Sequence, residues 1–400
     1  MSAPPTWPVG SPLNGRARSA LLAVVTTAAF LTFAQAFMVA PILPQLASAF
    51  GTGVGTVGLS VPAYLIPYGL MTLFWGPLSD RTGRRPVILG SLLIFAALTA
   101  ATALAPGATA FIVMRIATGI AASGVVPISL VLIGDVFPFA ERGRALGWLF
   151  GGMAGGIAVG STAGALAEPV LGWNGLFLVS GLSILLVGAL AAFLLPRPHR
   201  APTVVPWTEV ATGYQRLLAN VRGARTYSYV LLNAVLHSGI YTWLGVYLVQ
   251  RFDLGPIGVG LALLGYGVPG FLFGPVIGRL ADKYGRARII PLGMVTAAAC
   301  AFVLAVDPPL PVVVASIAIL SLGYDMTQPL FGGIVTDFPG STGQAVGLMA
   351  FALFLGFGTG SLIFQTMLGA GFPLALGVFG GGALIAATLA LPLFRSERPH

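Results

Sequence analysis

Long runs of apolar residues without charge recur along this 400-residue chain. Charged residues make up 8% of it, whereas soluble domains hold roughly 25%, and its mean hydropathy is +0.93. A helix needs about 20 apolar residues to cross the hydrocarbon core of a bilayer, where its backbone must be hydrogen-bonded internally. The runs have this length and lack the short alternating pattern of barrel strands. The sequence therefore predicts an all-α membrane protein.

Twelve candidate transmembrane helices can be counted in these runs. They lie near residues 19–40, 54–78, 86–105, 109–135, 145–167, 174–195, 227–250, 257–278, 289–306, 311–336, 344–369 and 373–394. The first run is too long for a cleaved signal peptide, and eleven more follow it. We therefore interpret it as a retained helix.

One charged string occurs twice, about two hundred residues apart. Residues 76–85 read GPLSDRTGRR, and residues 278–287 read GRLADKYGRA. Pro127 and Pro329 stand as many residues apart as the two strings do. Internal repeats of this length indicate two structural units that enclose a site near the middle of the membrane. We expect two pseudo-symmetric six-helix bundles.

The longest polar stretch divides the two halves. We expect a cytoplasmic N-terminal tail at 1–18, a first six-helix bundle at 19–196, a cytoplasmic linker at 197–226 and a second six-helix bundle at 227–396. Apolar spacing over 207–222 is compatible with a short amphipathic helix that lies on the cytoplasmic face of the membrane, and equally with a plain linker.

The net charge of +9 indicates orientation rather than a nucleic-acid partner. With the N-terminus inside, 18 of the 20 basic residues fall in cytoplasmic segments, while Arg251 faces outward and Arg115 lies within a span. This bias follows the positive-inside rule. It predicts a multi-pass protein of the bacterial inner (plasma) membrane with both termini cytoplasmic. Cys300 is the only cysteine, so the chain has no disulfide framework or cysteine metal site.

These motifs resemble the major facilitator superfamily, in particular its bacterial 12-helix drug/metabolite:proton antiporters. The repeated loop string carries most of the resemblance, together with RIATG at 115–119 and DVFPFAERGR at 135–144. The likeness extends over residues 19–396, and that superfamily is itself a known example of such repeats. It implies a secondary transporter that works by alternating access, a monomer with a small-molecule substrate, protons and the lipid bilayer as partners.

Two departures from the family pattern concern the direction of transport. Residues 160–165 read GSTAGA where proton-exchanging exporters have G-P-x-x-G-G, and residues 33–36 read FAQA where many drug exporters have an Asp. Two hypotheses therefore stay open. The first is proton-coupled efflux (antiport) of a lipophilic or drug-like compound, as in multidrug exporters. The alternative is a proton symporter or facilitator that imports a small metabolite.

Charged residues of the two loops are the expected gating latch, a set of contacts that holds helix ends together in one state only. Carboxylate and guanidinium groups can pair bidentately, and Gly83 permits a tight turn. The alternative is a static brace. The residues assigned to the latch, largely from the resemblance, are Asp80, Arg81, Arg84, Asp135, Asp282 and Arg286.

Three ionisable residues within spans are candidates for proton coupling. Asp325 is the acidic residue furthest inside a span, with Gln328 expected on the same helix face. Arg115 lies roughly 10 Å deep, where a cation costs about 2.5–3.5 kcal/mol and faces the bundle interior. His237 lies near the midplane and titrates in the physiological range. The alternative for each is a purely structural hydrogen-bonding role.

A ladder of glycines at Gly152, Gly156, Gly160 and Gly164 permits close helix approach. Two interpretations of this smooth face stay open. It serves close packing alone, or it lets the fifth helix slide against its partner in the other half.

Aromatic and amide side chains are expected to line the substrate cavity, whose character suits a lipophilic compound. They are Gln35, Phe37, Tyr64, Tyr68, Met153, Tyr241, Trp243, Tyr266, Gln328, Phe354, Phe357 and Gln365.

No nucleotide-binding loop of the form G-x-x-x-x-G-K-[ST] occurs in the sequence. Transport powered directly by ATP on this chain is therefore excluded. We also expect no cofactor, no catalytic residues and no metal site, and we expect the chain not to be an enzyme. An ion gradient, most simply the proton gradient, would drive it. A transport-incompetent receptor or assembly protein on the same fold is the rival from another class.

Overall fold

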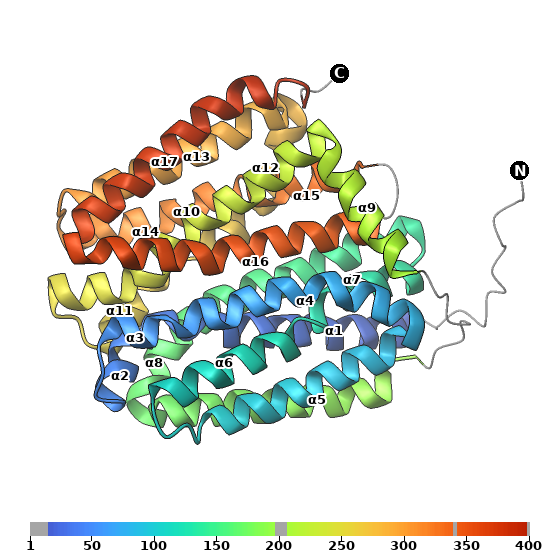
Figure 1. Cartoon of the computed structure of the whole chain (residues 1–400), viewed down its shortest axis with the longest axis horizontal. Helices are drawn as coiled ribbons and strands as arrows, with labels where there is room; N and C mark the ends of the chain where they lie inside the picture. The colour runs from blue at the N-terminus through green and yellow to red at the C-terminus, as the bar shows by residue number, and fades with distance from the viewer. Residues whose placement is uncertain (1–14, 197–205, 339–341, 398–400) are drawn as a thin grey trace, which may run out of the picture.

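The computed structural model describes residues 15–196, 206–338 and 342–397. Within these ranges the secondary structure is helical and contains no strand, as the apolar runs predict. Long helices lie side by side along one common direction (Figure 1). The molecule therefore has two opposite ends, which are built from helix termini and turns.

The helices fall into two groups that follow each other in sequence. The first comprises α1 (Gly15–Phe37), η1 (Ala40–Ile42), α2 (Leu43–Ala49), α3 (Val54–Gly58), α4 (Ser60–Thr82), α5 (Arg84–Thr102), α6 (Ala108–Ala122), α7 (Val125–Val136) and α8 (Phe139–Leu194). A short helix, α9 (Trp207–Ala219), follows. The second group comprises α10 (Val221–Phe252), α11 (Pro256–Leu263), α12 (Val268–Tyr284), α13 (Arg286–Ala305), α14 (Leu310–Asp325), α15 (Gln328–Thr336), α16 (Thr342–Met367), η2 (Leu368–Ala370) and α17 (Phe372–Leu393).

Ten segments of the described chain are long and apolar enough to cross a membrane. Two local features account for the difference from the twelve predicted spans. The helix α8 contains two of the predicted runs, separated by a kink at Gly172, where φ is 67°. The eighth run is divided into α11 and α12 by a break that ends at Gly267, where φ is 82°. The twelve-span architecture in two six-helix bundles is therefore retained.

Equivalent helices pack in equivalent pairs in the two groups. The helix α1 packs along α8 in the first group, and α10 packs along α16 in the second. Gly156 of α8 lies directly against the backbone of Phe30, and Gly360 of α16 lies against Val235. Small residues at these positions let the helix backbones approach closely. The repeated pairing matches the internal repeat of the sequence.

The glycine ladder of α8 therefore faces its own group. Gly152, Gly156 and Gly160 contact Thr26, Phe30 and Ala34 of α1, and Gly164 contacts Met38, which follows α1. The hypothesis that this ladder slides against a helix of the other half is wrong. Contact with the other half uses a different face of α8, because Leu166 lies against Gly260 of α11 and Ala158 against Gly267.

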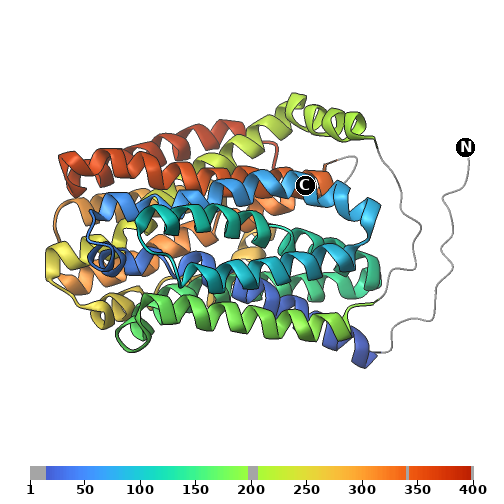
Figure 2. The same ribbon diagram turned by 60° about the horizontal axis from the view of Figure 1, so that its bottom comes forward.

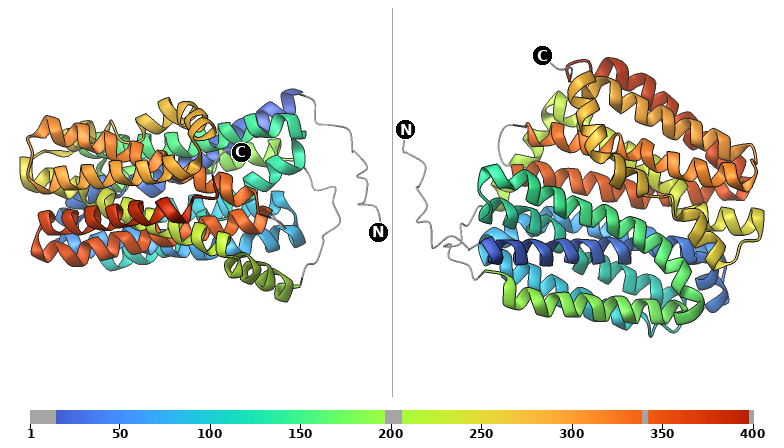
Figure 3. Two further views of the ribbon diagram at one scale, coloured as in Figure 1. Left: turned by 90° about the horizontal axis from the view of Figure 1, so that it is seen from above. Right: turned by 180° about the vertical axis from the view of Figure 1, so that it is seen from behind.

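The two groups lie beside each other and meet mainly through α4 with α16 and α8 with α11 (Figures 2 and 3). At the end that contains η1, which we call the η1 end, α10 joins this contact. There Gly245 lies against Pro41, and one turn further from this end the Tyr241 hydroxyl donates to the carbonyl of Phe37 at 3.2 Å. We call the opposite end, which contains the two charged strings, the motif end.

The segment between the groups contains a helix, which decides between the two alternatives for residues 207–222. This helix, α9, lies at the motif end and contacts α10 and α16. Its Tyr214 hydroxyl donates to the carbonyl of Leu73 in α4 at 3.2 Å. Residues 1–14 and 197–205 of the expected tail and linker lie outside the described residues, and α10 begins at Val221.

Candidate functional site

The first charged string forms a turn between α4 and α5 with an ion-paired network beside it. Gly83 ends α4 with a φ of 97°, a conformation that favours glycine. Arg84 then pairs with Asp80 at 2.6 Å and reaches Asp135, at the end of α7, at 3.3 Å. The structure thus brings together three of the predicted latch residues. They join the ends of α4, α5 and α7.

The second string repeats this arrangement. Gly285 ends α12 with a φ of 85°, and Arg286 pairs with Asp337 at 2.9 Å. The sequence analysis did not select Asp337, although it stands at the same offset from Asp135 as Arg286 does from Arg84. Applying the repeat offset to each latch residue would have found it. Asp282 lies in α12, but its side chain lies outside the described part of the chain.

Arg81 has a neighbour that the sequence did not predict. Its guanidinium lies over the ring of Trp207 in α9, 4.8 Å from the centroid. Phe74 of α4 also contacts Trp207, with ring centroids 6.1 Å apart. Arg81 therefore links the first group to the helix that connects the two groups.

Aromatic side chains from both groups meet between the two ends and form what we call the central aromatic cluster. Its members are Phe33 and Phe37 of α1, Tyr64 and Tyr68 of α4, His237 and Tyr241 of α10, Tyr266, Tyr324 of α14, and Phe354 and Phe357 of α16. The contact between Tyr68 and Phe354 joins the groups at 4.1 Å between centroids, and that between Phe37 and Tyr241 joins them at 5.5 Å. Most of the predicted cavity residues therefore form one contiguous set.

The part of the cluster in the first group surrounds Arg115 of α6, which is fully buried. Its guanidinium lies over the ring of Tyr64, 4.1 Å from the centroid, and its Nε donates to the carbonyl of Ser60 at 3.4 Å. Both terminal nitrogens lack a hydrogen-bond partner among the described residues, as do the amide of Gln35 and the hydroxyl of Tyr68. A buried cation with free donors favours an anionic or hydrogen-bonding group beside it.

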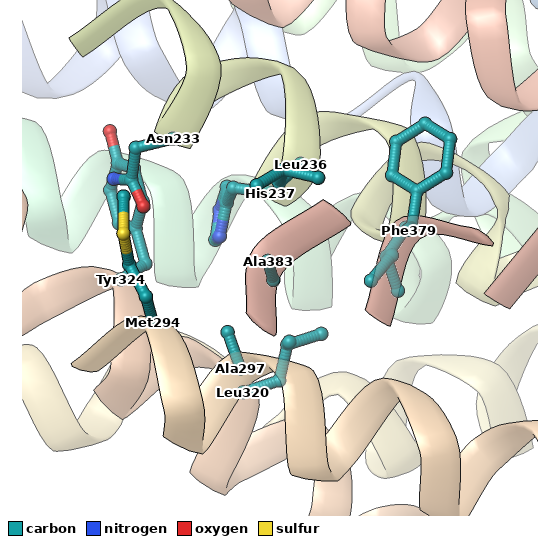
Figure 4. Close-up of a pocket in the computed structure, with 10 residues that line it drawn as sticks. Asn233, Leu236, His237, Met294, Ala297, Leu320, Tyr324, Phe379 and Ala383 are labelled. Carbon is teal, nitrogen blue, oxygen red and sulfur yellow. The ribbon is translucent and has the colours of Figure 1, made fainter. Parts of the chain in front are cut away.

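The part in the second group surrounds His237 of α10. Its Nε2 is hydrogen-bonded to the hydroxyl of Tyr266, and its ring stacks on that of Tyr324 with centroids 3.9 Å apart. His237 and Tyr324 also border a small cavity of about 10 Å³, which has room for about one water molecule (Figure 4). Among the residues that the structure describes, His237 is therefore held by aromatic rings and by the hydroxyl of Tyr266.

Asp325 lies at the last residue of α14, beside this cluster. The Ser321 hydroxyl donates to Asp325 Oδ2 at 3.3 Å and accepts from the backbone N–H of Gly267 at 2.9 Å. The helix is interrupted at Met326 and Thr327 before α15 begins, so Gln328 belongs to another helical segment than Asp325, and their common helix face stays a prediction.

Some predicted cavity residues lie elsewhere. Trp243 and Gln365 face the η1 end, where Trp243 Nε1 donates to the carbonyl of Ser361 at 3.1 Å. Met153 packs at the margin of the hydrophobic core. The amide of Gln328 has no hydrogen-bond partner among the described residues. Trp243 is two residues from Tyr241, so the two side chains leave α10 in different directions.

No group of three or more His, Cys, Asp and Glu side chains that could hold a metal lies in the ranges that the structure describes. The buried ionisable side chains of Arg115 and His237 lie apart from each other, each among aromatic rings.

Two helical groups that enclose buried polar residues within a membrane-spanning core are characteristic of secondary transporters. The chain matches the family model of the Major Facilitator Superfamily over residues 25–263 and 230–400, and it belongs to this superfamily of membrane transporters. Proteins of this kind are multi-pass membrane proteins that bind small-molecule substrates.

Individual relatives are moderately similar. The MFS-type transporter YwfA of Bacillus subtilis (strain 168) is 28% identical over 325 residues, covering 79% of this chain and 77% of that protein. A chloramphenicol resistance protein of Pseudomonas aeruginosa is 27% identical over 274 residues, 67% of this chain and 64% of that one. The crystal structure of a D-xylose–proton symporter has a TM-score of 0.78 at 17% identity, covering 93% and 97% of the two chains. This last likeness concerns the fold.

Proposed function

We propose that this protein exports a small lipophilic or drug-like compound across the bacterial plasma membrane in exchange for protons. The observation that carries the proposal is the central aromatic cluster, which joins the two helical groups and contains buried polar groups. Aromatic walls with a few polar groups suit an apolar compound that has one or two hydrogen-bonding functions. The similarity to a chloramphenicol resistance protein supports a substrate of this class.

Alternating access is the mechanism we propose for this export. The bundles at 19–196 and 227–396 rock against each other, so that the cluster faces one side of the membrane and then the other. The contacts of Phe37 with Tyr241 and of Pro41 with Gly245 close the η1 end in the present arrangement. The latch residues at the motif end hold or release helix ends during this movement.

Proton coupling is assigned to Asp325, with Arg115 and His237 as supporting groups. Asp325 is half-buried at a helix break and hydrogen-bonded through Ser321 to Gly267, which starts α12. A change in its charge therefore acts on two broken helices at once. The proton gradient replaces any cofactor in this scheme.

Membrane orientation follows from the basic residues. We propose that the motif end faces the cytoplasm, because both charged strings, Arg222 and Arg225 lie there. Both termini are then cytoplasmic, and the protein acts as a monomer.

Import of a metabolite by proton symport is the second candidate. The observation in its favour is the sequence GSTAGA at 160–165, which lacks the proline and the last glycine of the exporter motif. In α8, Gly160 serves packing against Ala34 of the same group.

Transport in inverted membrane vesicles tests the proposal. A thermal-shift screen of antibiotics, dyes and metabolites first selects a compound that stabilises the purified protein. Vesicles with an acid interior should then accumulate this compound, and Asp325→Asn should abolish the accumulation while leaving downhill exchange intact. The matched control is Asp253→Asn, at the η1 end of α10, which should transport normally. Accumulation only under the reversed gradient would make the protein an importer.

A further inference from the structure

We propose that the η1 end contains a second ligand site, distinct from the central aromatic cluster, that binds a small aromatic anion. The site is a cavity of about 550 Å³, which is within the size range of small-molecule sites. We call it the end pocket. Its walls include Gly55 of α3, Trp243, Tyr247 and Arg251 of α10, Gln365 of α16, and Phe372.

Both helical groups contribute to the end pocket. Val54 and Gly55 come from the first group, and the remaining walls come from the second. The Gln365 amide spans the boundary, since its Nε2 donates to the carbonyl of Gly55 at 2.8 Å. Its Oε1 is buried and has no hydrogen-bond partner among the described residues. An occupant of this pocket therefore contacts both groups.

Aromatic rings form the apolar part of the walls. The rings of Tyr247 and Phe372 pack edge to face with centroids 5.2 Å apart. The polar atoms of Tyr247 and Trp243 already have partners. The Tyr247 hydroxyl donates to the carbonyl of Leu304, and the Trp243 indole N–H donates to the carbonyl of Ser361. The rings therefore present hydrocarbon to the pocket, which suits a flat aromatic body.

Arg251 provides the positive charge of the pocket. It is ion-paired with Asp307, which also lines the pocket, and it donates to the carbonyls of Asp307 and Pro308, the latter at 3.4 Å. The Asp307 side chain is 54% exposed, so water screens its pairing with Arg251. A carboxylate on the ligand competes with the exposed Asp307 carboxylate for the terminal N–H groups of the guanidinium. The chemistry thus selects an aromatic anion over a neutral analogue.

Occupation of this site has a consequence for transport, which rests on the alternating-access mechanism proposed above. The η1 end must open in the other state of the cycle, and opening separates Gly55 from Gln365. A ligand that binds only when these residues are close stabilises the present state. Such a ligand inhibits transport without competing for the central aromatic cluster.

Binding of 2-naphthoate to the purified full-length protein tests the site by isothermal titration calorimetry. Arg251→Gln should weaken binding about tenfold, because a hydrogen bond to a charged group is lost. Arg395→Gln, which removes an exposed cation at the motif end, is the matched control and should bind as the unmodified protein does. Equal affinities of the Arg251→Gln variant and the unmodified protein would overturn the proposal.

A comparison of two ligands on the unmodified protein tests the site even if the Arg251→Gln variant does not fold. The neutral 2-naphthamide should bind the unmodified protein about tenfold more weakly than 2-naphthoate, and equal binding would exclude Arg251 as the recognition element. This measurement needs no transport, so it stays valid if the proposed export fails.

Protection of an introduced cysteine locates the ligand. In a Cys300→Ala background, 2-naphthoate should slow maleimide labelling of Val54→Cys and leave labelling of Leu104→Cys unchanged. Leu104 is 83% exposed in the loop between α5 and α6 at the same end. Unchanged labelling at Val54→Cys, or equal slowing at both positions, would place the ligand elsewhere and refute the end pocket.

Discussion

Arg286 and Asp337 form an ion pair at 2.9 Å, in the position that Arg84 and Asp135 occupy in the first half of the chain at 3.3 Å. Each pair joins the start of one helix, α5 or α13, to the end of another, α7 or α15. The repeat therefore extends from the loop strings to their partners in distant helices. The two halves keep the same charged contact, although the neighbouring residues differ.

Neutralising these carboxylates separates a latch from a static brace. The side chains of Asp135 and Asp337 are 43% and 49% exposed, so each pair contributes less than about 1 kcal/mol to stability. We expect Asp135→Asn and Asp337→Asn to leave the melting temperature almost unchanged and to alter the turnover of transport at least threefold. Turnover in reconstituted vesicles is the measurement.

The control for this prediction is Glu141→Gln, which removes another exposed ion pair at the motif end, with Arg18 at 3.0 Å. It should change neither the melting temperature nor the turnover. If all three variants transport at the wild-type rate, the charged network is only a brace.

The glycines of α8 give a prediction about packing. A Cβ at Gly156 would overlap the carbonyl of Phe30 and come within 3.0 Å of Phe33 Cβ, whereas a Cβ at Gly151 would meet nothing within 4 Å. Overpacking of this kind costs about 1–3 kcal/mol. We expect Gly156→Ala to lower the melting temperature clearly and Gly151→Ala to leave it unchanged. Equal melting temperatures of the two variants would contradict the described contact between α1 and α8.

This glycine ladder also illustrates the limits of prediction from the sequence. Spacing by four predicts a smooth helix face, and the structure confirms that the face packs closely. The identity of the partner is a tertiary property, because α1 and a helix of the other half offer similar apolar surfaces. The sequence therefore could not decide which of them covers Gly156.

The fold was largely predictable from the sequence, because a membrane imposes strong rules on it. Apolar length predicts the spans, and the repeated string predicts two similar halves. The break at Met326 and Thr327, which separates Asp325 from Gln328, has a signal in the sequence that the analysis did not use: Pro329 has no N–H to donate to the carbonyl of Asp325, so it interrupts the helix there. Helical periodicity predicts that Tyr241 and Trp243, two residues apart, leave α10 in different directions, but it does not predict which of them faces the other helical group.

Trp207 provides a prediction about the connecting helix α9. The guanidinium of Arg81 lies 4.8 Å from the centroid of its ring, and an exposed contact of this type contributes about 0.5–1 kcal/mol. We expect Trp207→Ala to increase amide hydrogen exchange in residues 207–219 about two- to fivefold, because α9 then detaches more often. The conservative variant Trp207→Phe retains an aromatic face and should show a smaller increase. Unchanged exchange in Trp207→Ala would mean that other contacts hold α9.

Glu397 provides a prediction about pH. Burial disfavours ionisation of this carboxyl, but hydrogen bonds and charge from Arg222 and Arg225, with contacts of 2.6–2.8 Å, outweigh this effect and lower its pKa. A carboxyl with a lowered pKa in the folded state stabilises the fold above its unfolded pKa of about 4.3. This stabilisation is lost as the pH falls through the lower, folded value.

We therefore expect Glu397→Gln to reduce the free energy of unfolding at pH 7 by about 1.5–3 kcal/mol, the range for hydrogen bonds to charged groups. Thermal unfolding of both proteins between pH 3 and pH 7 is the measurement, and the difference should shrink on acidification. Glu209→Gln, at an exposed position of α9, is the control and should melt as the unmodified protein does at every pH. A constant difference between Glu397→Gln and the unmodified protein over the whole range would show that the carboxylate charge does not act there. In that case packing of α17 against α10, rather than the ion pairs of Glu397, would anchor the end of the chain.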